Sequence, residues 1–76
     1  MALTSITPLA LVMAEQKVSQ VELTRRSGLA RKTVVDAYHG KGVELPSWIR
    51  IAKALDVPLM RIAPDAAAEL EGLRIA

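Results

Sequence analysis

Cationic and apolar side chains alternate at helical spacing between Ser19 and Gly40. The apolar positions are Val21, Leu23, Leu29, Val34 and Ala37, and the cations are Arg25, Arg26, Arg31 and Lys32. Guanidinium and ammonium groups donate hydrogen bonds to phosphate oxygens and to the exposed edge of guanine. The spacing therefore predicts two short amphipathic helices joined by a tight turn at Gly28, a unit that can dock in the major groove of DNA.

The charge of the chain is unevenly distributed, although its net charge is only +2. Between Lys17 and Lys53 there are eight Lys or Arg against three Asp or Glu, a net charge of +5, whereas the rest of the chain has two against five, a net charge of −3. A basic centre between acidic flanks indicates one face meant for a polyanion. An ordinary solvated helix surface is the alternative, and charge alone does not decide between the two.

Other kinds of chemistry find little support in the sequence. We expect no enzyme, because the residues form no nucleophile with a base, no glycine-rich phosphate loop and no cluster of metal ligands. The chain has no cysteine, and its single His39 has no partners for a metal site. We therefore expect no cofactor, metal or small-molecule ligand. No apolar run reaches the roughly 18 residues that span a bilayer, so we expect a cytoplasmic protein without a membrane partner.

Local capping signals predict the first two helices. Thr7-Pro8 indicates a helix start, because threonine is a good N-cap and proline is tolerated at the first helical position. Hydrophobic spacing carries this helix to about Gln16. Ser19 with Glu22 three residues later is a capping box, which predicts a second helix over 20–27. Gly28 ends that helix, since glycine readily takes the left-handed conformation of a C-terminal cap.

The rest of the chain is predicted to continue in short helices. We expect them at 31 to 38 or 39, at 45–55, at 59–62 and at 66–73, with a glycine loop at 40–42 and a break at Pro64-Asp65. Trp48 is expected in the core or in an interface. The fold class is all-α: one domain over 1–76, a compact bundle of about five short helices, with an N-terminal arm at 1–6 and the helix-turn-helix at 20–39.

The resemblance to a known family rests on four groups of residues. They are SQ at 19–20, the pattern L-x-x-x-x-G-L-x-R-x-T-V over 23–34, and HGKG at 39–42, followed by IAKALDVPLMRI at 51–62. With them, the stretch from Val18 to Ile62 resembles the Cro/CI-type (XRE, lambda-repressor-like) helix-turn-helix domain of phage repressors and small bacterial regulators. The resemblance implies a DNA-binding transcription regulator.

The same resemblance implies which residues would contact DNA. Ser19 and Gln20 would lie beside the DNA backbone, where Gln20 would bind a phosphate. The exposed positions of the recognition helix would be Arg31, Lys32, Thr33 and Asp36, and its N-terminal part points into the groove. Arg31 or Lys32 can donate to guanine, Thr33 can reach a phosphate or a base, and Val35 can meet a thymine methyl group. Asp36 could accept from cytosine, or could instead orient Arg31 or Lys32. Lys41 and the amides of Gly40 and Gly42 would contact phosphates.

The sequence departs from the family pattern at several positions. Met13 and Tyr38 stand where the family often has an ion pair between its first and third helices, and we expect an apolar contact in its place. Ala30 replaces the usual Ser or Thr cap, and Ala37 replaces a larger core residue. These changes bear on the tilt of the third helix and hence on the assignment of bases.

Two functions from different classes follow. The first is a sequence-specific regulator, a Cro-like repressor that binds double-stranded DNA at a short symmetric operator as a homodimer. The second is a protein-interaction module of the same fold, such as an antitoxin or an anti-activator. The dimer is expected because 51% of the residues are hydrophobic, which leaves apolar surface to cover in so short a chain. The C-terminal segment 64–76 is a candidate dimer contact.

Overall fold

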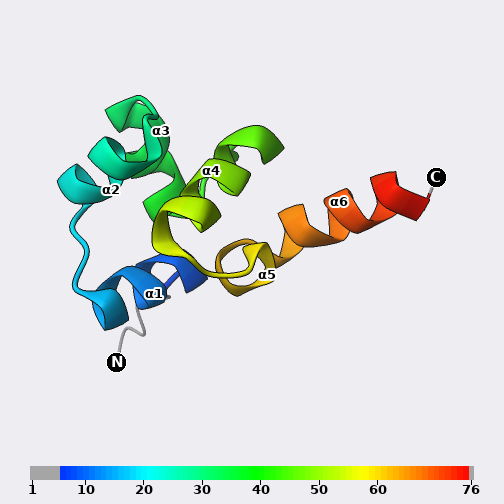
Figure 1. Ribbon diagram of the computed structural model, residues 1–76, viewed down its shortest axis with the longest axis horizontal. Coiled ribbons are helices and arrows are strands. Elements are labelled where there is room, and N and C mark those ends of the chain that lie inside the picture. The colour runs from blue at the N-terminus through cyan, green and yellow to red at the C-terminus, as the bar shows by residue number, and fades with distance from the viewer. Residues whose placement is uncertain (1–5, 76) are drawn as a thin grey trace.

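Over the residues that the structure describes, the chain folds into helices and forms no strand, as the sequence predicts (Figure 1). A computed structural model describes residues 6–75, with side chains up to residue 72, so most of the expected N-terminal arm lies outside the described residues. The helices are α1 (Pro8–Gln16), α2 (Gln20–Ser27), α3 (Arg31–Tyr38), α4 (Leu45–Leu55), α5 (Leu59–Ile62) and α6 (Pro64–Ile75). The described residues form no strand, and no helix among them is long and apolar enough to cross a membrane.

The core is built from the apolar stripes of the first four helices. Leu9 of α1, Leu23 of α2, Val34 of α3, and Ile51 and Leu55 of α4 are the largest fully buried side chains. Buried positions recur at three- or four-residue intervals within these helices, as at Leu9 and Val12 or at Val34 and Ala37, which places them on one face of each helix. Burial of a leucine or isoleucine side chain contributes about 1.5–3 kcal/mol, so this shared core fixes how the helices pack.

Thr7 connects the start of α1 to the end of α3. Its Oγ1 accepts a hydrogen bond from the Ala10 amide at 3.1 Å, which confirms the predicted N-cap. The same hydroxyl donates to the Tyr38 carbonyl at 2.8 Å. The last carbonyls of a helix have no partner within the helix, so this bond satisfies one that would otherwise be unpaired. The N-cap of α1 therefore also holds the C-terminal end of α3.

Two non-glycine residues end helices in the left-handed conformation. Lys17 has φ +59° after α1, and Asp56 has φ +55° after α4. The Gln16 side chain donates from Nε2 to the Leu55 carbonyl at 2.8 Å. This hydrogen bond links the C-terminal end of α1 to the C-terminal end of α4.

The last helix differs from the prediction. α6 begins at Pro64 and continues to Ile75, so the expected break at Pro64-Asp65 and the expected range 66–73 were wrong. Proline lacks an amide hydrogen, but the first residue of a helix needs none, so Pro64 starts α6 without cost. α6 packs on α5 and α4 where Ala66 is buried, and its later turns extend away from the bundle (Figure 1).

Candidate nucleic-acid interface

The α2–α3 unit is held by its turn and by buried residues from both helices. Gly28 has φ +72°, and its amide donates to the Thr24 carbonyl at 3.1 Å, which confirms the predicted glycine cap. Ser27 is buried, and its hydroxyl accepts from the Leu29 amide at 3.3 Å. Leu23 of α2 and Val34 of α3 are fully buried on the inner sides of their helices. The orientation of α3 relative to α2 is therefore fixed by the turn and by the core together.

The side chains predicted to read DNA lie on the outer side of α3. Arg31 and Lys32 are exposed in the first turn, and Thr33, Val35 and Asp36 are half-buried at the edge of that surface. Lys32 Nζ lies 3.9 Å from Asp36 Oδ2, so of the two cations that Asp36 was expected to orient, it faces Lys32. As predicted, Ala30 provides no side-chain cap, which leaves the first amides of α3 available to an outside acceptor.

At the start of α2, Ser19 is exposed and Gln20 is half-buried. Ser19 Oγ accepts from the Glu22 amide at 3.1 Å, which confirms half of the capping box. The other half is wrong, because the Glu22 carboxylate binds arginines of its own helix and makes no hydrogen bond to the Ser19 amide among the described residues. No described hydrogen bond involves the Gln20 side-chain amide, which can therefore still bind a phosphate oxygen.

Glu22 forms an exposed ion-pair cluster with two arginines. Its Oε2 lies 2.7 Å from Arg25 Nη2 and 2.7 Å from Arg26 Nε. The hydrogen bonds from Arg25 and Arg26 hold the pKa of the Glu22 carboxyl below its usual range, and the same contact raises the pKa of Arg25. The cluster offsets part of the positive charge of α2, as Asp36 does for Lys32 on α3, whereas Arg31 forms no ion pair among the described residues.

The loop after α3 presents Lys41 but not every predicted backbone donor. Lys41 is exposed, and its amide donates to the Asp36 carbonyl at 2.9 Å. The Gly40 amide donates to the Ala37 carbonyl at 3.1 Å, so this donor is occupied within the chain, and its contact with a phosphate stays a prediction. Gly42 is exposed, and its amide makes no hydrogen bond among the described residues, so it stays a candidate phosphate contact.

Among the described residues, three hollows border this unit. Thr33 and Asp36 of α3 border one of about 340 Å³, which the loop and the start of α4 complete. Ser19 and Gln20 border another, of about 220 Å³, together with Met13 and Tyr38. Met13 and Tyr38 thus line the same hollow, and Met13 is buried, while the apolar contact expected between them stays a prediction.

The third and largest hollow, about 390 Å³, is bordered by Trp48 and Lys41 and by the starts of α1 and α6. Trp48 is half-buried and packs against the core, as expected. Within the residues whose side chains are described, no His, Asp or Glu side chains gather in a group that could hold a metal ion.

Arg50 is a further candidate that sequence reasoning missed. A Cβ atom built on Gly28 would lie 3.7 Å from Arg50 Nη1, so this exposed α4 side chain lies at the α2–α3 turn. The packing of α4 on α2 brings it there. In the sequence it is only a polar position between Ile49 and Ile51, and no local signal distinguishes it.

Comparison of the chain with protein-family models, with curated proteins and with solved structures finds no match.

Proposed function

We propose that this chain is a sequence-specific DNA-binding transcription regulator, a Cro-like repressor that acts as a homodimer in the cytoplasm. The observation that supports it best is the exposure of Arg31 and Lys32 in the first turn of a helix that its neighbours hold in place. Buried Val34 and Ala37 anchor the inner side of α3, so its outer side is a rigid, cationic surface. A surface of this kind fits the major groove, where the N-terminal residues of a recognition helix contact base edges.

The side chains on the outer side of α3 have different roles in the proposed complex. Arg31 and Lys32 donate to the O6 and N7 atoms of guanine, and the Val35 methyl groups contact the methyl group of thymine. Thr33 donates to a phosphate or a base. Asp36 keeps Lys32 in place across one turn of the helix, or accepts from cytosine N4 when Lys32 turns to a base.

A second group of side chains fixes the position of the protein on the backbone. Gln20, Ser19 and Lys41 lie at the start of α2 and after α3, and Arg50 adds a cation at the turn between these helices. Contacts with phosphates position a protein on the duplex and do not read sequence. In a dimer, the two half-sites lie about 10 base pairs apart, centre to centre.

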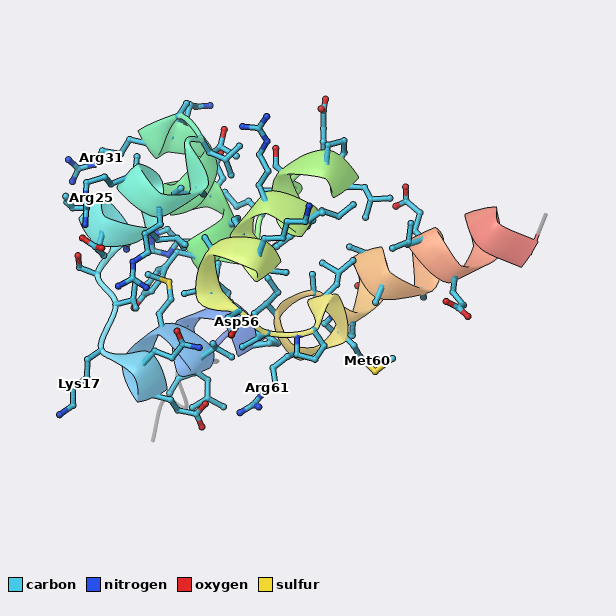
Figure 2. All side chains as sticks on the ribbon, viewed as in Figure 1. Lys17, Arg25, Arg31, Asp56, Met60 and Arg61 are labelled. Atoms are coloured by element: carbon cyan, nitrogen blue, oxygen red, sulfur yellow. The ribbon has the colours of Figure 1, made fainter. Side chains whose placement is uncertain are left out.

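Fluorescence anisotropy on DNA selected from a random pool tests the proposal. The double variant Arg31→Ala, Lys32→Ala should lose specific binding, at a cost of about 1–3 kcal/mol for each lost base contact. Arg50→Ala should weaken binding to all sequences alike and lower the salt dependence by about one counterion. Lys17→Asn is the matched control, because it removes an exposed cation far from Arg31 (Figure 2) and asparagine tolerates the left-handed backbone.

The outcomes separate the two functional classes. Specific binding that survives the Arg31→Ala, Lys32→Ala change would contradict the residue assignment. An absence of binding above that of random DNA, together with one stoichiometric protein partner in a pull-down, would overturn the proposal in favour of a protein-interaction module.

A further inference from the structure

The hollow of about 390 Å³ beside Trp48 brings together segments that lie far apart in the sequence. It is bordered by the start of α1, the end of α3 and the loop that follows, the start of α4, the end of α5 and the start of α6. Small-molecule sites usually have volumes of about 300–1,000 Å³. The packing of the bundle therefore builds a space of ligand size that no local pattern in the sequence indicates.

The apolar lining of this hollow belongs to the packed part of the bundle. Its buried members are Ala37, Ile62, Ala63 and Ala66. Trp48, which is half-buried and packs against the core, adds a large aromatic side chain to the lining. None of the large apolar side chains that are exposed on the described surface borders the hollow. The apolar area is thus recessed, which suits the body of a small molecule better than the flat face of a protein.

The charged side chains at the rim of the hollow are unequal in sign. Asp65 and Glu69 of α6 are exposed and border the hollow, and their spacing of four residues places both on the same side of the helix. Lys41, also exposed, is the base at this rim. Two acids against one base give the rim a net charge of −1.

We propose that this hollow binds a small organic cation, an amine with an aromatic or aliphatic body. An ammonium group is attracted to carboxylates and to the face of an indole ring, the aromatic side chain that attracts cations most strongly. Asp65, Glu69 and Trp48 offer both kinds of partner at one site. The apolar body of the amine displaces water from the buried lining. An anionic ligand would meet two like charges and one opposite charge, so charge complementarity selects the cation.

This inference goes beyond the proposed function and does not depend on it, because the amine is expected to bind in the absence of DNA. It departs from our expectation that the chain takes no small-molecule ligand. That expectation came from the sequence, in which Trp48, Asp65 and Glu69 form no local motif.

Trp48 provides the measurement, because it is the only tryptophan of the chain. Its fluorescence reports directly on occupancy of the hollow. Three probes of similar shape differ in charge at neutral pH: phenethylamine is a cation, 2-phenylethanol is neutral and phenylacetate is an anion. Phenethylamine should produce a saturable change and bind about tenfold more tightly than 2-phenylethanol, since it gains contacts with the indole and the carboxylates. Phenylacetate should bind most weakly of the three.

The acids of α6 include a matched control. Asp65→Asn and Glu69→Gln should each weaken phenethylamine binding roughly threefold, by the usual strength of an exposed charge contact. Glu71→Gln removes an exposed acid of the same helix that does not border the hollow, so it should leave the affinity unchanged at physiological salt, where distant charges are screened. Lys41→Gln removes the like charge and should strengthen binding.

Far-UV circular dichroism verifies that each variant is folded. The absence of a saturable change in Trp48 fluorescence, equal affinities for the three probes, or an effect of Glu71→Gln as large as that of Glu69→Gln would overturn the proposal.

Discussion

The hydroxyl of Thr7 provides a measurable test of how α3 is held. Thr7→Val replaces the hydroxyl by a methyl group of similar size and keeps the β-branched shape. It removes the N-cap bond from the Ala10 amide and the bond to the Tyr38 carbonyl, at 3.1 and 2.8 Å. The other methyl group of the side chain stays in place beside Gly40, where an added Cβ would lie 3.1 Å from Thr7 Cγ2. The substitution therefore isolates the two hydrogen bonds from the packing.

The expected loss follows from the two bonds. Loss of a threonine N-cap costs about 1 kcal/mol, with a range of roughly 0.5–2. Loss of a part-buried hydrogen bond costs about 1 kcal/mol more. We expect the free energy of unfolding to fall by about 2 kcal/mol, which corresponds to a melting temperature about 8–16 °C lower for a domain of this size.

Urea and thermal unfolding, followed by far-UV circular dichroism, measure this loss. Thr7→Ser is the control, because it keeps the hydroxyl and removes the methyl group beside Gly40. It should lose clearly less stability than Thr7→Val. A Thr7→Val protein within about 0.5 kcal/mol of wild type, the usual range for neutral surface changes, would refute the assigned role of the hydroxyl.

Two further predictions concern α2. Gly28→Ala should cost about 1–2 kcal/mol in urea unfolding because of the left-handed backbone alone, since the new Cβ would meet Arg50 Nη1 at an ordinary 3.7 Å; a neutral result would contradict the left-handed turn. Glu22→Gln should make the free energy of unfolding less dependent on pH in the acid range. Its pKa is lowered from 4.5 in the folded chain by Arg25 and Arg26, so its contribution is present above pH 4.5 and is lost as the pH falls through the lower folded value. Equal acid sensitivity of both proteins would show that the cluster does not couple to folding.

The helix boundaries were predictable because their signals are local. Thr7, Ser19 and Gly28 act within one turn of their own position, so the sequence alone indicates where α1 starts, where α2 starts and where α2 ends. The error at Pro64 also arose from a local signal, because that signal is ambiguous. Proline can end one helix or start the next, and here the burial of Ala66 against the bundle favours the start.

The candidate site was less predictable, because several of its features depend on tertiary packing. The exposed positions of α3 follow from helical periodicity around Val34 and Ala37. Arg50, in contrast, reaches the α2–α3 turn only because α4 packs on α2. The Gly40 amide is occupied because the backbone turns back on Ala37 where α3 ends, and the pattern of side chains in the sequence does not specify that turn.

The position of α6 gives the molecule an uneven electric field. α6 has three exposed acids, Asp65, Glu69 and Glu71, against one base in its sequence, Arg74. It extends away from α2 and α3 (Figure 1), and the outer side of α3 carries Arg31 and Lys32. Positive charge therefore gathers at one end of the molecule and negative charge at the other. Under the proposed function, the electric field of the DNA orients the approaching protein so that α3 faces the DNA and α6 faces away from it. Orientations with α6 toward the DNA are repelled, because its acids meet the negative phosphates. In this proposed encounter, the acidic helix makes no contact with DNA and acts only on the rate of association, most strongly at low salt.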